Sequence, residues 1–204
     1  MTDAMIQLSA LVKATRSDAL LDVFLTVYND AYQTNKAKTC VEAKALAGLA
    51  RQLLRLPNFG IAKQSGYILN FPFTFEVREE FDVLRFSKDT VLNIELKSQF
   101  PRKSSVIAQL RRHKAILDVL GKQTILCSFI RQENKLYLLK NDDLIQITFR
   151  QLSNLITEDY LLENELVTMS TPAKIRAAAQ HATKVAAQQR KLVRRPRLKF
   201  SFKE

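Results

Sequence analysis

The stretch that decides the fold is EFDVLRFSKDTVLNIELKSQ, residues 80–99. Two runs rich in Phe, Val, Leu and Ile, EFDVLRF and TVLNIELK, flank the short polar stretch SKD, and this composition predicts two antiparallel strands joined by a turn. A turn centred between Lys88 and Asp89 places Asp82 directly opposite Glu95. Opposed residues of neighbouring strands have Cβ atoms roughly 4.5–5.5 Å apart, so the hairpin predicts a close pair of carboxylates.

The second strand adds a lysine to this pair. Side chains alternate between the two faces of a strand, so Glu95 and Lys97 share one face. The opposite face carries the apolar residues Leu92, Ile94 and Leu96. Two carboxylates and one ammonium group are therefore expected to meet on one patch of the sheet.

A divalent cation would explain why two carboxylates face each other, because without one they repel across a strand pair. Magnesium prefers hard oxygen ligands and keeps several waters and substrate phosphate oxygens in its shell. It polarises a bound phosphate and lowers the pKa of a bound water, and Lys97 would orient that water or stabilise charge on the phosphate. The pattern indicates phosphodiester hydrolysis. The plainer alternative is that Asp82, Glu95 and Lys97 are ordinary surface residues of a half-exposed hairpin.

The surrounding sequence alternates between helical and strand-like patterns. Apolar spacing, with Pro and Gly as stop signals, predicts helices over residues 20–32, 39–56, 104–120 and 142–156, with Gly121 as a C-cap. Runs of β-branched and aromatic residues predict strands over residues 67–77, 80–86, 90–97, 123–130 and 135–140. This order predicts an α/β domain with a mixed central sheet flanked by helices, preceded by N-terminal helices.

The hairpin and the element order together resemble the core of the PD-(D/E)xK, or restriction-endonuclease-like, nuclease superfamily. In that family an Asp begins one strand and the (D/E)xK triplet ends the next. The resemblance covers roughly residues 39–140 and implies a restriction-endonuclease-like core. It also implies that Asp82 and Glu95 ligate Mg²⁺ or Mn²⁺, joined by the Leu96 carbonyl, and that Lys97 is the catalytic lysine.

Two further positions follow from the same resemblance. Many members related to phage recombination exonucleases carry a glutamate on the preceding helix, where this chain has Glu42; the alternative is a capping box in which Glu42 bonds back to the amide of an N-cap Thr39. Those members often carry Gln-x-x-x-Tyr on the helix after the lysine. This chain has Gln109 but His113 in place of the tyrosine. Gln109 is expected to contact the metal-site water or DNA, whereas His113, within RRHK, is predicted to be solvated, with a role as a base as the alternative.

The net charge of +12 is concentrated at the C-terminal end of the sequence. The last 34 residues hold ten basic residues against Glu204 alone, and Thr171-Pro172 is predicted to begin a basic, Ala-rich helix. Such a polycation suits nucleic acid; the alternative is a solubilising tail. A basic rim, or else a solvated helix face, is predicted beside the acidic patch. The expected nucleic-acid contacts are Arg102, Lys103, Arg111, Arg112, Lys114, Arg190, Lys191, Arg194, Arg195 and Arg197.

The composition argues against several other classes of protein. The four glycines form no phosphate-binding loop motif, and two scattered histidines support no Ser-His-Asp or Cys-His hydrolase. Cys40 and Cys127 lie far apart without a CxxC motif, which favours reduced thiols and a cytoplasmic location and makes a zinc site unexpected. Apolar runs are too short for a membrane span, and no secretory signal is visible.

The sequence thus predicts three regions: a helical region over 1–38, a nuclease-like core over 39–160 and a basic helix with a tail over 161–204. The predicted function is that of a Mg²⁺-dependent endo- or exodeoxyribonuclease. One alternative is a DNA-binding module with a nuclease-like fold that does not cleave. Another is a nuclease subunit that acts as a homodimer or with a helicase or ATPase, in a bacterial or phage recombination, repair or defence context.

Overall fold

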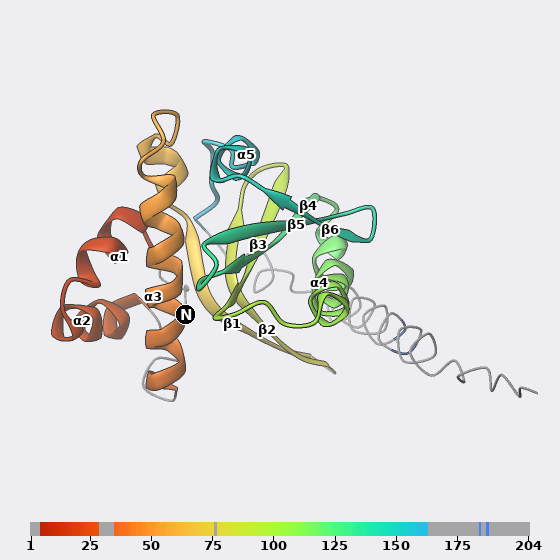
Figure 1. Cartoon of the computed structure of the whole chain (residues 1–204), viewed down its shortest axis with the longest axis horizontal. Helices are drawn as coiled ribbons and strands as arrows, with labels where there is room; N and C mark the ends of the chain where they lie inside the picture. The colour runs from red at the N-terminus through yellow and green to blue at the C-terminus, as the bar shows by residue number, and fades with distance from the viewer. Residues whose placement is uncertain (1–4, 29–34, 76, 163–183, 185–186, 188–204) are drawn as a thin grey trace, which may run out of the picture.

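The computed structural model describes residues 5–28, 35–75 and 77–162, together with residues 184 and 187. It is an α/β structure in which one mixed, six-stranded sheet carries helices on both faces (Figure 1). Three helices precede the sheet, one crosses between its central strands and one follows it. The predicted α/β class and the N-terminal helices are confirmed. The predicted C-terminal helix lies outside the described residues, apart from positions 184 and 187.

The elements follow one another in a simple order. The helices are α1 (Leu8–Ala14), α2 (Asp18–Tyr28), α3 (Lys36–Leu53), α4 (Lys103–Leu117) and α5 (Phe149–Leu155), with short 3-10 helices at Ile61–Gln64 and Asp118–Leu120. The strands are β1 (Tyr67–Phe75), β2 (Val77–Phe86), β3 (Thr90–Lys97), β4 (Gln123–Ile130), β5 (Lys135–Lys140) and β6 (Asp143–Ile147). Gly121, with a φ of 68°, ends the 3-10 turn after α4 as a left-handed cap.

The strands lie in the sheet in the order of the sequence, from β1 to β6. Neighbours are antiparallel except for β3 and β4, which run parallel and are joined by the crossover helix α4. A parallel pair needs such a long connection because its two strands start at the same edge. The carboxyl ends of β3 and β4 therefore open at one edge, where Lys97 pairs with Ile130.

The register of the β2–β3 hairpin is the one the sequence predicts. Val83 pairs with Ile94, and Phe86 pairs with Val91 beside the turn. This register follows from a turn centred between Lys88 and Asp89. A slip of one residue would move every side chain of β3 to the opposite face of the sheet. In the observed register, Ile94 packs in one hydrophobic core while its neighbour Glu95 faces α4.

Each face of the sheet has its own hydrophobic core. One core joins α1, α2, α3 and α5 to the sheet and includes Leu46, Val83 and Ile94. The other packs α4 against residues such as Phe81 and Leu84. Among the phenylalanines of β1 and β2, Phe73, Phe81 and Phe86 are buried and Phe71 packs against the core, whereas the side chain of Phe75 is not described. Polar side chains of β2 and β3 lie between α3, which packs on the first core, and α4, which packs on the second.

Two sequence predictions of local structure are wrong. The helix expected over residues 142–156 is instead strand β6 followed by the shorter α5, which begins at a Thr148 capping box. Asn141 and Asp142 both have positive φ angles, which is the geometry of the tight hairpin turn that Asn and Asp favour. The helix expected to begin at Thr39 begins at Lys36. Thr39 is therefore inside α3, and its amide donates to the Asn35 carbonyl.

Candidate active site

Asp82, Glu95 and Lys97 meet on one patch formed by β2 and β3. The Lys97 Nζ lies 3.0 Å from Glu95 Oε2 and 3.8 Å from Asp82 Oδ2. Asp82 also accepts a hydrogen bond of 2.8 Å from the Leu96 backbone N–H through Oδ2. Glu95 is fully buried, and Asp82 is 6% exposed. The three residue types selected from the sequence are thus in direct contact, and they are not ordinary surface residues.

A local distortion of β1 accompanies the placement of Asp82. The β1–β2 register pairs Leu69 with Val83 and Phe71 with Phe81, and it leaves Asn70 and Asp82 without a pairing between them. Asn70 has a φ of 56°, a left-handed conformation that Asn tolerates better than most residues. One residue of each strand lies between these two pairs, so the register continues unchanged and only the pairing at this position is interrupted. The distortion lies directly beside the proposed metal ligand.

Glu95 is held by donors from two elements. Its Oε2 accepts from Lys97 on β3 and from Gln109 Nε2 on α4, the second at 2.5 Å. Its Oε1 lies 3.1 Å from His113 Nδ1, an ion-pair contact rather than an aligned hydrogen bond. Gln109 and His113 are four residues apart on α4, so they lie on the same side of the helix. Gln109 therefore belongs to the site, as expected.

Glu42 enters the same cluster from α3. It is buried, and its Oε2 has no hydrogen-bond partner within the described residues. The capping-box alternative is wrong, because Asn35 and not Thr39 is the N-cap of α3. Sequence reasoning missed Lys38, whose Nζ contacts Glu80 at 2.5 Å and lies 3.7 Å from Glu42 Oε1. Its spacing of four residues from Glu42 was the available signal.

Burial and mutual repulsion control the ionisation of the carboxylates. Burial and the nearby Glu95 charge raise the pKa of Asp82 to about 8. Burial likewise raises the pKa of Glu42. Burial also opposes the charge of Glu95, but His113 and Lys97 outweigh it and lower the Glu95 pKa. One carboxylate is therefore held ionised while its two neighbours resist ionisation. A bound cation would favour the ionised form of those two neighbours as well.

The donor set fits a hard divalent cation better than zinc. Carboxylate oxygens from Asp82 and Glu95 are the ligands that Mg²⁺ prefers, and Glu42 contributes a buried oxygen that lacks a donor. Within the described residues, no three side chains of His, Cys, Asp or Glu gather closely enough to enclose an ion alone. The ion would thus need backbone oxygen and water as further ligands. That requirement is met by Mg²⁺, which keeps several waters when bound to proteins.

His113 was predicted to be solvated, and this prediction is wrong. The side chain is 0% exposed, between Glu95 on one side and Glu79, whose Oε2 is 3.4 Å from Nε2. Burial opposes protonation, but Glu79 and Glu95 outweigh it and raise the pKa of His113 to about 9. The prediction failed because RRHK is a basic run, which is typical of an exposed helix face. The two carboxylates beside the ring lie on strands that are distant in sequence.

The predicted basic rim is largely paired with carboxylates. Lys103 contacts Asp143, Arg111 contacts Asp142, Lys114 contacts Asp118, and Arg112 contacts Glu79. Exposed ion pairs contribute little free energy, so a phosphate group can replace the carboxylate in such a pair. The structure nevertheless gives the α4 face less free positive charge than the sequence suggests. Arg190, Lys191, Arg194, Arg195 and Arg197 lie outside the described residues.

Comparison of the chain with protein-family models, curated protein sequences and solved structures finds no match in any of the three. No helix in the described ranges is both long and apolar enough to cross a membrane.

The pKa values predict how stability depends on pH without metal. Asp82 binds its proton up to about pH 8 in the folded protein but only to about pH 4 when unfolded, so stability falls as pH rises between those values. His113 contributes stability that is lost between pH 6.5 and about pH 9. We expect urea denaturation in EDTA to show a decline of up to roughly 6 kcal/mol from pH 6 to pH 9, because each group contributes about 1.4 kcal/mol per pH unit while only the folded state holds its proton.

The variant Asp82→Asn should remove much of that decline, because its side chain does not ionise. Asp89→Asn, at an exposed turn position, is the matched control and should leave the slope unchanged. A free energy of unfolding that is constant or rises across this pH range would contradict the assignment of a buried, protonated Asp82.

Proposed function

We propose that this chain is a metal-dependent nuclease of the PD-(D/E)xK type. The observation that carries the proposal is the contact of Lys97 with both Asp82 and Glu95 in a buried acidic cluster. Burying like charges together is costly and needs compensation. A divalent cation would offset that cost and place a phosphodiester beside the lysine.

The roles of the residues follow from their positions. Asp82 and Glu95 would hold Mg²⁺ or Mn²⁺, with the Leu96 carbonyl as a further ligand, and the ion would supply Lewis-acid polarisation of the phosphate and a more acidic bound water. Lys97 donates hydrogen bonds to oxygen atoms, so it would orient the attacking water and stabilise negative charge on the phosphate. Gln109 fixes the Glu95 carboxylate by donating a hydrogen bond from its amide. Glu42 lies close enough to raise the Asp82 pKa, and its Oε2, unpartnered within the described part of the chain, could accept a hydrogen bond from a water near the ion.

The fold supports this proposal through its element order. The sequence α3, β1, β2, β3, α4, β4 is the order helix, three strands, helix, strand implied by the resemblance to the superfamily. The acidic residues come from β2 and β3, and Gln109 comes from the following helix. Helices α1 and α2, and the β5–β6–α5 segment, are additions around that order.

A non-cleaving DNA-binding module is the second candidate, and DNA cleavage separates the two. The proposal predicts cleavage of at least one of three DNAs, end-labelled linear, closed circular or single-stranded, with Mg²⁺ or Mn²⁺ and none with EDTA. Products from closed circular DNA would indicate an endonuclease. Asp82→Asn should abolish cleavage, while Asp89→Asn, in the exposed turn, should not. Binding to DNA without cleavage of any substrate under any metal condition would favour the module.

The basic C-terminal residues predict a salt-dependent contribution to DNA affinity. Replacing Arg190, Lys191, Arg194, Arg195 and Arg197 by Gln removes five positive charges. Because each phosphate contact adds about 0.9 to the slope of log affinity against log salt, we expect the slope to flatten by up to about 4. Fluorescence anisotropy titrations of DNA between about 50 and 300 mM salt measure this slope. An unaltered slope would show that the tail does not contact nucleic acid.

A further inference from the structure

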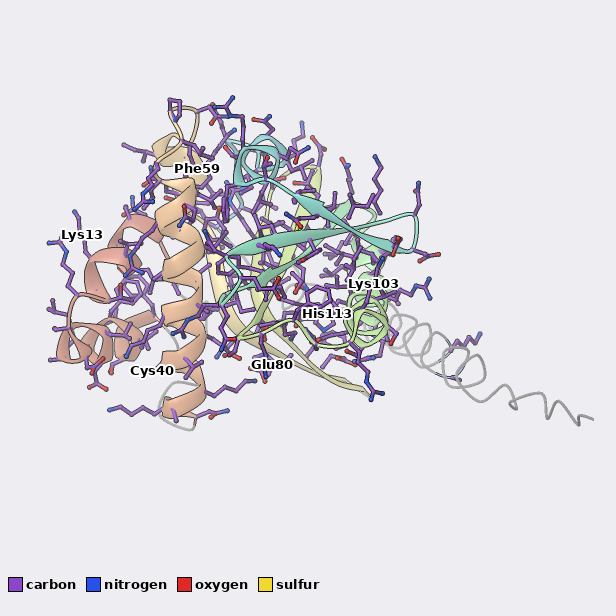
Figure 2. The ribbon with its side chains drawn as sticks, in the orientation of Figure 1. Lys13, Cys40, Phe59, Glu80, Lys103 and His113 are labelled. Atoms are coloured by element: carbon purple, nitrogen blue, oxygen red, sulfur yellow. The ribbon has the colours of Figure 1, made fainter. Side chains whose placement is uncertain are left out.

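His113 lies at the centre of a buried network that joins α4 to β2 and β3. Its ring packs on Phe81, with centroids 4.4 Å apart, and no part of it is exposed to solvent. Nδ1 lies 3.1 Å from Glu95 Oε1, and Nε2 lies 3.4 Å from Glu79 Oε2. Figure 2 shows His113 on the side of α4 that faces the sheet. The ring thus lies between two carboxylates from different strands, at ion-pair distance from each and without an aligned hydrogen bond to either.

The second carboxylate is itself fixed from behind. Arg112 Nε donates to Glu79 Oε1 at 2.5 Å, so Glu79 is held between a guanidinium and the imidazole. The order Arg112, Glu79, His113, Glu95 alternates donors and acceptors from α4 and the two strands. Buried charged groups are stable only when they are paired in this way.

Hydrogen-bond complementarity defines what the ring does. Carboxylate oxygens only accept, so an imidazole facing two of them matches both when each nitrogen carries a proton. The Asn93 amide lies 2.9 Å from Nδ1, and its Oδ1 is buried without a partner. In the structure the atom that faces Nδ1 is Asn93 Nδ2; only an amide turned by 180° would let Oδ1 accept from the ring, and Nδ2 would then occupy the place that Oδ1 now holds. The pocket therefore accommodates a double donor.

Glu95 is consequently surrounded on both oxygens. Lys97 and Gln109 donate to Oε2, and His113 faces Oε1. We propose that His113 is a positioning residue that fixes the Glu95 carboxylate for binding of the divalent cation, with Glu79 fixing the ring in turn. This inference rests on the proposed function, because it assigns Glu95 to the metal. Groups that orient a metal ligand in this manner usually change metal affinity by about 10–100-fold when removed.

Metal binding without turnover tests the proposal. Full-length protein is titrated with Mn²⁺, and free Mn²⁺ is followed by electron paramagnetic resonance. His113→Phe fills the space against Phe81 but donates nothing, so the Mn²⁺ Kd should rise about 10–100-fold. His113→Gln, which keeps one donor, should fall between His113→Phe and the unaltered protein. Glu79→Gln should raise the Kd less than His113→Phe, since it acts through the ring.

Thermal unfolding of the same variants separates positioning from a purely structural role. A structural role alone lowers Tm and leaves the Mn²⁺ Kd of the folded protein unchanged, which would overturn the inference. His181→Phe, at the other histidine of the chain, is the control and should leave the Kd unchanged. If His113→Phe does not fold, unchanged Kd values in both His113→Gln and Glu79→Gln would overturn it. Unaltered protein that binds no Mn²⁺ would overturn the proposed function together with this inference.

Discussion

Replacing Lys97 with alanine is expected to lower metal-dependent DNA cleavage by about 10²–10³-fold, the usual effect of removing one donor from a preorganised site. The ammonium contacts both Asp82 and Glu95 and does not ligate the cation. Its loss should therefore reduce the rate of the chemical step while Mn²⁺ binding stays the same or becomes tighter. A weak phosphate-binding role would instead raise KM and leave kcat unchanged.

The matched control is Lys88→Ala, because Lys88 is exposed in the hairpin turn of the same two strands. It should cleave as the unaltered protein does. Single-turnover cleavage at saturating Mg²⁺ measures the effect on the chemical step. Cleavage by Lys97→Ala within a few-fold of the unaltered rate would remove Lys97 from the mechanism.

The largest expected effect on stability comes from Arg85. It is 3% exposed and its guanidinium donates to the carbonyl oxygens of four residues: Ala62, Ser65, Thr157 and Asp159. It also lies 5.6 Å from the Tyr67 ring centroid and 5.8 Å from that of Tyr160. Arg85 thereby ties the segment after α5 to the sheet at the β2–β3 hairpin.

We expect Arg85→Met to lower the free energy of unfolding by about 3 kcal/mol, because buried carbonyl groups lose their donor. The loss is smaller than the sum of the bonds, since burial already opposes the guanidinium charge and lowers its pKa. Urea denaturation measures it, with exposed Arg150→Met as the control. A change below about 0.5 kcal/mol, the range of ordinary surface substitutions, would contradict this role.

The hairpin was predictable because its information is local. Alternating residues on β2 and β3 fix the faces, the turn fixes the register, and together they place Asp82 beside Glu95 and Lys97. Gln109 was pointed out by the resemblance to the superfamily, through the Gln-x-x-x-Tyr pattern, and the structure places its amide on the Glu95 carboxylate.

The wrong predictions have two origins, one local and one non-local. The β5–β6 turn at Asn141 and Asp142 was overlooked because the following QITF did not resolve strand from helix. That single error also hid the acids that pair with Lys103 and Arg111, so the α4 face was predicted to be more basic than it is. By contrast, nothing near His113 in the sequence reveals that carboxylates from two strands surround it.

The most direct test of the account is the position of a bound Mn²⁺ ion in crystals of this protein, located by its anomalous scattering. We predict one anomalous peak between Asp82 and Glu95, adjacent to Lys97. The distance from the ion to the carboxylate oxygens should be roughly the 2.0–2.3 Å expected for a small divalent cation. A protein that takes up no Mn²⁺ at millimolar concentration, or that holds it away from both carboxylates, would contradict the claim that this hairpin is a metal-dependent nuclease site.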